Sequence, residues 1–141
     1  MSSSRKVLKI FSLAQVVIAV IALVLGAITL AGAGGATGDP VNVLGSELDP
    51  TVFATLVGVL IDLSGLLTLI TAVLGIRGAN RPSRLGSHRL LSLLAALASL
   101  AAMFIGSNFG SLATPTVTMV AFALAVFAAV FDTRVRRELD R

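Results

Sequence analysis

The sequence predicts an all-α integral membrane protein, a four-helix bundle made of two helical hairpins. Four long apolar runs fill most of its 141 residues, and each is long enough, or nearly so, to cross a hydrocarbon core of about 30 Å. The runs are 7–31, 52–76, 88–106 and 115–131, and together they form one domain, 1–141. The connections sort by charge, because every basic residue lies before the first run or in its first turn, between the second and third runs or in the first turn of the third, or after the fourth.

This charge pattern predicts the orientation of the chain. Basic residues hold a connection in the cytoplasm, so both termini and the central connection are expected there, in a bacterial plasma (inner) membrane. The first run begins like a signal peptide, but its apolar core, 10–30, exceeds the roughly 7–15 residues typical of one, so we expect an uncleaved anchor. The residues to which we assign topology and contact with anionic lipid head groups are Arg77, Arg81, Arg84, Arg89, Arg134, Arg136 and Arg137.

Composition excludes several classes of function. Apolar residues make up 56% of the chain and charged residues 13%, which is unlike a soluble domain. The pI of about 11.2 would suggest nucleic acid in a soluble protein. Here each basic segment adjoins an apolar run, so attraction to lipid is the interpretation and no nucleic-acid partner is expected. The absence of Cys excludes disulfide and iron–sulfur chemistry, and a single His excludes a haem held by two histidines. No cofactor or metal is expected.

Small residues recur at helical spacing along each run. They include Gly26 in the first run, Gly58 and Gly65 in the second, and Ala102 and Gly106 in the third. Helices in lipid gain no hydrophobic energy by touching, so close packing through small side chains must supply the attraction. This helix-packing seam predicts a compact bundle whose large aliphatic side chains face lipid.

The two hairpins resemble each other in sequence. A shift of 80 residues superposes the first run on the third, with Ser12 on Ser92 and Gly26 on Gly106. The second and fourth runs also open alike, each with Pro-Thr-Val. A tandem duplication explains these matches, and so does chance in apolar sequence of low complexity.

The two outer connections differ in length. Residues 32–50 form the longer one, which is too short for a domain, and residues 107–114 are expected to form a tight turn. Asp49 followed by Pro50 predicts the start of the second helix, because Asp caps a helix N-terminus and Pro suits its first turn.

The central connection carries the most distinctive local motif. Gly78 is expected to close the second helix in a left-handed conformation, and Pro82 to prevent the helix from resuming. The motif Leu-Gly-Ile-Arg-Gly-Ala-Asn-x-Pro at 74–82 resembles a turn in small uncharacterised bacterial four-span membrane proteins. The resemblance covers only this turn and implies the four-span layout without a function.

Asp62 is the only formal charge deep inside a run, where an Asp costs roughly 2.5–3.5 kcal/mol on insertion scales. It lies between Gly58 and Gly65, so we expect it to point into the bundle. One interpretation is a carboxylate that handles protons or cations. The other, which we favour because no second ionisable group completes a relay, is a structural Asp bonded to Ser99 or Thr29.

Three other polar residues have predicted roles. Gln15 is expected to bond across helices. His88 is interpreted as either a pH sensor or a hydrated residue at the membrane surface, with the second favoured. Asp132 is expected to end the fourth helix and to pair with Arg134 and Arg136, or to bond a cytoplasmic loop.

No paired carboxylates, Ser–His–Asp set, metal-ligand spacing or phosphate loop appears, so an enzyme is not expected. The first hypothesis is an accessory or scaffold membrane protein that acts through helix–helix contacts, in a homo-oligomer or with other membrane proteins. The alternative is an oligomeric small transporter or channel that uses Asp62. A third possibility, a signalling component that senses through its outer loop, has only the acidity of that loop behind it.

Overall fold

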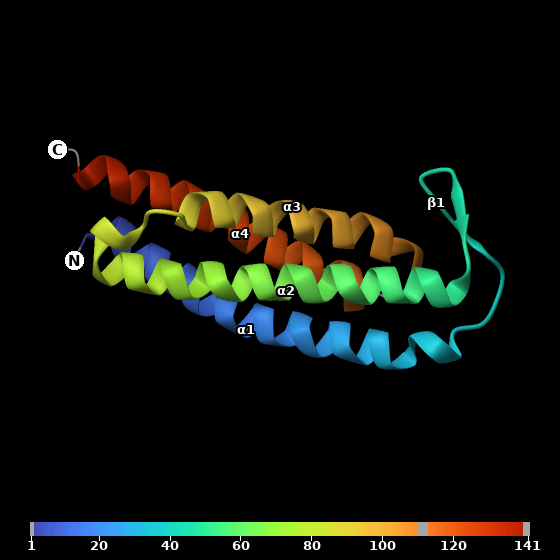
Figure 1. Ribbon diagram of the computed structural model, residues 1–141. Coiled ribbons are helices and arrows are strands. Elements are labelled where there is room, and N and C mark those ends of the chain that lie inside the picture. The colour runs from blue at the N-terminus through green and yellow to red at the C-terminus, as the bar shows by residue number, and fades with distance from the viewer. Residues whose placement is uncertain (1, 110–112, 140–141) are drawn as a thin grey trace.

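A computed structural model of the chain describes residues 2–109 and 113–139. Its four helices are α1 (Ser3–Gly32), α2 (Pro50–Asn80), α3 (His88–Gly106) and α4 (Ala113–Leu139). They form one bundle in which α1 packs on α2 and α4, and α3 packs on the same two helices (Figure 1). These helices make up most of the described chain, so the all-α prediction is confirmed. Each helix is also long and apolar enough to cross a membrane.

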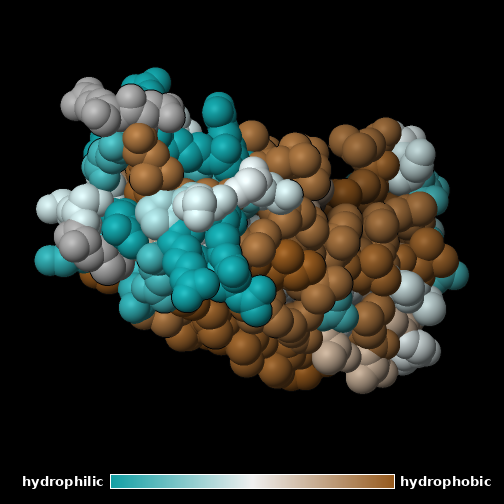
Figure 2. Space-filling model, turned by 60° about the vertical axis from the view of Figure 1, so that its left-hand side comes forward, coloured by the Kyte–Doolittle hydropathy of each residue, from teal (hydrophilic) through white to brown (hydrophobic). Residues whose placement is uncertain are grey.

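The two ends of the bundle differ in character. One end holds the start of α1, the end of α2, the start of α3 and the end of α4, and we call it the basic end (Figure 1). Figure 2 shows hydrophilic side chains gathered mainly at this end, while hydrophobic side chains cover most of the remaining face. The sides of the helices are therefore the surfaces suited to lipid.

The start of α2 follows its sequence signal. The Asp49 side chain accepts a hydrogen bond from the Thr51 backbone N–H at 3.0 Å, and Pro50 occupies the first turn. The Asp49 carboxylate therefore satisfies one of the free N–H groups of the helix end.

The end of α2 corrects the expectation for Gly78. The helix continues through Gly78 to Asn80, and a short 3₁₀ turn, Pro82–Arg84, follows. A methyl group at Gly78 would collide with the Leu85 side chain, so this glycine makes room for the returning chain rather than closing the helix. The stop comes at Pro82, which has no N–H to continue the helix.

Three helices extend clearly beyond the predicted apolar runs. The first run begins at 7, but α1 begins at Ser3; the second ends at 76, but α2 reaches Asn80; and the fourth ends at 131, but α4 reaches Leu139. Hydrophobicity marks the part of a helix suited to lipid, whereas backbone hydrogen bonds continue through the polar turns beyond it. Asp132 therefore lies inside α4 and not at its end.

The longer outer connection contains a β-hairpin that the sequence analysis missed. Strands β1 (Val41–Val43) and β2 (Ser46–Leu48) pair antiparallel around Leu44 and Gly45. Both turn residues have positive φ, 50° and 86°, as a two-residue hairpin turn requires. The strand side chains Val41, Val43 and Leu48 pack against the buried cluster around Phe53.

Two other short turns join the elements. The 3₁₀ turn Ala33–Gly35 continues α1, and the turn Ser107–Phe109 follows α3. Residues 110–112 of the predicted second outer turn lie outside the described residues.

The seam residues lie where helices approach closely. Gly58 packs against Leu30, and a side chain at Gly65 would meet Leu23 and the Ala19 carbonyl oxygen at 3.0–3.2 Å. Seam residues of the other helices are buried as well: Gly26, Ala102 and Gly106. A side chain at Gly26, Gly58 or Gly65 would push α1 and α2 apart, whereas one at Gly106 would collide with Thr114 of α4.

Candidate functional site

Asp62 lies on the outer surface of the bundle, in the groove between α1 and α2. The groove is lined by Asp62 with five apolar residues, Leu23, Leu30, Val59, Leu63 and Leu66. The Asp62 side chain is half-buried, and its Oδ1 atom is buried without a hydrogen-bond partner in the protein. Asp62 therefore does not point to the centre of the bundle, as predicted, but lies at the α1–α2 groove with Oδ1 turned toward Gly26 of α1.

The position of Asp62 follows from helical geometry. Successive residues turn by about 100°, so Asp62 and Ser64 point to opposite sides of α2. Ser64 faces α3 and forms a 2.6 Å hydrogen bond with Ser99. Thr29 donates to the Leu25 carbonyl oxygen at 2.8 Å. Both partners expected for Asp62 are thus engaged elsewhere.

Gly26 makes room for the Asp62 carboxylate. A methyl group at Gly26 would collide with Asp62 Oδ1, so the carboxylate occupies the space that any larger α1 residue would fill. Exposed apolar side chains flank the groove on α1 and α2, among them Val24, Val59 and Leu63. A single polar group thus stands unpaired in an apolar groove.

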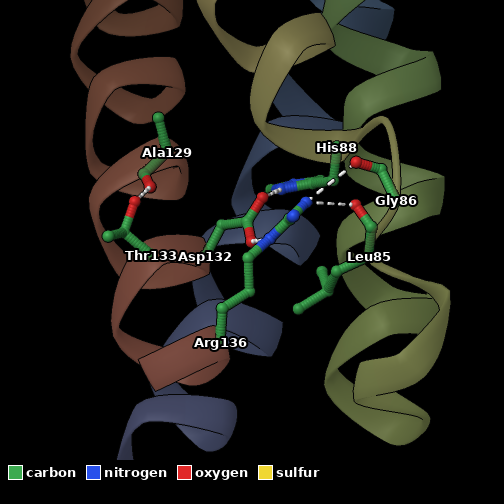
Figure 3. A network of polar contacts seen from close by, with 7 residues as sticks. All are labelled: Leu85, Gly86, His88, Ala129, Asp132, Thr133 and Arg136. Carbon is green, nitrogen blue, oxygen red and sulfur yellow. Dashed lines mark hydrogen bonds and ion pairs between the residues drawn. The ribbon is translucent and has the colours of Figure 1, made fainter. Parts of the chain in front are cut away.

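A second polar cluster joins α3, α4 and the turn before α3 at the basic end (Figure 3). His88 Nδ1 and Asp132 Oδ2 are 2.9 Å apart, and Arg136 Nε donates to Asp132 Oδ1 at 2.6 Å. The same guanidinium donates to the carbonyl oxygens of Leu85 and Gly86 at 2.8 and 2.9 Å. Arg136 therefore links α4 to the start of α3.

This cluster changes several sequence expectations. His88 is fully buried, so its interpretation as a hydrated surface residue is wrong. The predicted pair of Asp132 with Arg136 is present, whereas Arg134 lies 5.1 Å from the centre of the Phe131 ring. Part of the cluster could have been found from residue spacing. Asp132 and Arg136 are four residues apart, so they share one face of α4, although the predicted apolar run ends before both of them.

Ser12 lies on the other side of His88. The two side chains meet beside Gly75, where a methyl group would collide with Ser12 Oγ and stand 3.0 Å from His88 Nε2. No hydrogen bond joins Ser12 Oγ to His88 Nε2, so among the described residues Ser12, His88 and Asp132 do not form the connected triad of a hydrolase. All three are fully buried, so no substrate reaches the serine, and Ser12 Oγ has no hydrogen-bond partner in the protein.

Other buried polar groups near this layer are also unpaired in the protein. Both polar atoms of Gln15 have no hydrogen-bond partner there, so its predicted bond across helices is absent. Ser92 and Thr71, on facing positions of α3 and α2, show the same feature. Among the described residues, no three His, Asp or Glu side chains are grouped to hold a metal ion.

Comparison with known proteins gives no relative from which a role could be transferred. No family model, curated protein sequence or solved structure matches the chain. The resemblance of the 74–82 turn to small bacterial membrane proteins stays a prediction, and so does the tandem duplication. The function must therefore be argued from the groove at Asp62 and from the charge distribution.

Proposed function

We propose that this chain is an accessory or scaffold subunit of the plasma (inner) membrane that spans it four times and acts through helix–helix contacts. The basic end lies in the cytoplasm with both termini, and the groove around Asp62 receives a helix of another membrane protein. The unpaired Asp62 carboxylate in an outward-facing apolar groove is the observation that carries this proposal.

The energetics of Asp62 favour a partner. A carboxyl group facing hydrocarbon without a hydrogen bond is costly, and polar residues within a membrane normally pair with another polar group. Leu23 and Leu63 line the groove beside Asp62, and neither side chain offers a donor. A neighbouring helix that carries a hydroxyl, amide or basic side chain would supply the missing donor while its apolar surface fills the groove.

Charge complementarity points to a different protein rather than a second copy. The exposed residues of this chain at the depth of Asp62 are apolar, among them Val24, Val59 and Leu63. A second copy of this chain would therefore offer the groove only apolar side chains and its own Asp62 as the polar group. A helix with a hydrogen-bond donor matches the site better.

Site-specific photocrosslinking tests the proposal. A benzoylphenylalanine replaces Leu66 in the groove, or Leu97 on the exposed face of α3 as the control, and the cells are irradiated. We expect an adduct with one membrane protein from the groove position and none from the control. In the groove, Asp62→Leu should reduce the adduct about threefold or more, since interhelical hydrogen bonds contribute roughly 0.6–1.7 kcal/mol.

The Asp62→Asn variant sharpens the test, because the amide keeps hydrogen-bonding capacity and should retain most of the adduct. Equal adducts at both positions, or an adduct insensitive to Asp62→Leu, would contradict the proposal. An adduct between two differently tagged copies of this chain would replace the partner protein with a homo-oligomer.

The same groove favours one alternative, an oligomeric small transporter or channel that uses Asp62. A carboxylate beside leucine side chains suits a cation with an apolar body. Reconstituted vesicles distinguish the two functions. We expect no flux from the purified wild-type protein, and a cation-dependent flux that Asp62→Asn abolishes would favour the transporter.

A further inference from the structure

A pocket lined by arginines lies at the basic end, away from the Asp62 groove. Arg77, Asn80, Arg81 and Arg84 line it, all four are exposed, and no acidic side chain lines it. Its volume of about 390 Å³ falls within the roughly 300–1,000 Å³ of ligand sites.

Local structure brings the three guanidinium groups together. Arg77 and Arg81 are four residues apart at the end of α2, so they share one face of the helix. At Arg81 the backbone leaves the helix, and the turn Pro82–Arg84 returns Arg84 to the same pocket. The arrangement thus depends on the proline that stops α2.

The negative end of α2 is masked from this pocket. A helix C-terminus presents free carbonyl oxygens, which repel anions. Here Arg5 on α1 donates to the carbonyl oxygens of Ala79 and Asn80 at 2.7 and 2.8 Å. Lys9 Nζ lies 3.4 Å from Asn80 Oδ1, so the amide oxygen is engaged and the amide nitrogen stays available as a donor.

The charge around the pocket is not balanced. Among the residues that the structure describes, the segments of the basic end carry ten basic residues against two acidic ones, Asp132 and Glu138. The two ion pairs of Asp132 are with His88 and Arg136, not with the pocket arginines. Three guanidinium groups in one pocket repel one another unless an anion lies between them.

We propose that this pocket binds the phosphate of an anionic phospholipid, with Arg77, Arg81 and Arg84 as donors. Guanidinium groups bind phosphate oxygens in a bidentate manner, and basic pockets at helix ends on the cytoplasmic side are suited to lipid head groups. The proposal uses the membrane placement of the proposed function but not the Asp62 groove, so either can fail alone.

A continuous apolar surface favours a lipid over free phosphate. Ile70 and Val73 are exposed and lie seven and four residues before Arg77, on the same face of α2. A lipid whose head group binds Arg77 would therefore place its acyl chains along this face of α2. Free phosphate would gain nothing from these side chains.

Native mass spectrometry of the purified protein in detergent tests the site. Phosphatidylglycerol, phosphatidylcholine and glycerol phosphate are titrated separately. We expect one retained phosphatidylglycerol, with affinity at least about tenfold above that for phosphatidylcholine. The combined variant Arg77→Gln, Arg81→Gln, Arg84→Gln should lose about tenfold or more of that affinity.

The matched control removes the same charge elsewhere at the basic end, with Arg89→Gln, Arg134→Gln and Arg137→Gln. These arginines do not line the pocket and attract anionic lipid only diffusely, so the control should keep most of the affinity for the one retained lipid. Replacing the three pocket arginines by Lys keeps the charge and should still weaken binding, because Lys lacks the bidentate geometry. Equal losses in pocket and control variants would overturn the site in favour of a diffuse charge effect. Glycerol phosphate competing as well as the lipid would overturn the lipid assignment, and so would equal affinity for phosphatidylcholine.

Discussion

Asp62 and Asp132 show how differently one residue type is accommodated in this bundle. Asp132 is fully buried and accepts hydrogen bonds from Arg136 and His88, whereas Asp62 has a buried oxygen without a partner. A buried carboxylate that is paired and hydrogen-bonded belongs to the fold. The Asp62 carboxyl group has no such partner and lies half-buried in a groove at the surface of the bundle, which is why the proposed function rests on Asp62.

Removing the Asp132 carboxylate should destabilise the basic end. Asp132→Ala leaves His88 buried without its partner and removes the ion pair of Arg136. We therefore expect the free energy of unfolding to fall by about 3 kcal/mol. This value is near the lower end for a broken buried pair, because Arg136 is partly exposed. Unfolding by dodecyl sulfate in mixed micelles measures the change. Arg137→Ala, at an exposed position of the same helix, should stay within about 0.5 kcal/mol of wild type. Similar effects of both variants would mean that the cluster contributes little to stability.

Packing between α1 and α2 operates at the scale of helices. Gly65 on α2 faces the backbone of α1, where an added side-chain carbon would meet Leu23 N at 3.1 Å and Ala19 O at 3.2 Å. Neighbouring backbones cannot yield as a flexible side chain can. The helix pair therefore depends on glycine at this position.

Gly65→Leu should separate α1 from α2 and lower the free energy of unfolding by roughly 1–3 kcal/mol, the usual cost of overpacking. Gly32→Leu provides the matched control, because a side chain there meets nothing within 4 Å. Steric trapping or dodecyl sulfate unfolding compares the two variants. If Gly32→Leu were as destabilising as Gly65→Leu, the close approach of α1 and α2 could not be the cause of the loss, because Leu has a higher helix propensity than Gly at both positions.

Charge asymmetry acts at the scale of the whole molecule. The helix ends bring the basic residues of the described chain to one end of the bundle, and the β-hairpin lies at the other (Figure 1). Such an asymmetry predicts one orientation in the membrane, because Lys and Arg near a span are retained on the cytoplasmic side.

Reporter fusions at Ala36 and after Arg141 should therefore report an external and a cytoplasmic location, respectively. Combined replacement of Arg77, Arg81 and Arg84 by neutral residues should loosen the orientation of the second hairpin, since these charges hold the central connection inside. A cysteine introduced at Arg81 and labelled by an impermeant reagent from outside would contradict the predicted orientation.

Some features of the site were beyond prediction from the sequence, and the reasons are geometric. Asp62 was assigned to the interior because Gly58 and Gly65 flank it, yet helical rotation places it beside Gly26 of α1, in the groove at the edge of the α1–α2 contact. His88 and Asp132 are 44 residues apart, so only the packing of α3 on α4 brings them together. The β-hairpin was missed because strands of three residues carry too little alternation to read.

The sequence by itself determined the four apolar helices, the Asp49–Pro50 start of α2 and the stop at Pro82. These features depend on composition and local chemistry, namely hydrophobic length, an N-cap side chain and a missing N–H. Only the tertiary structure decided which polar groups are paired, which face of α2 carries Asp62, and how Arg77, Arg81 and Arg84 come to share one pocket. The rotation and register of each helix set these contacts, and both result from the sum of many small packing energies between helices.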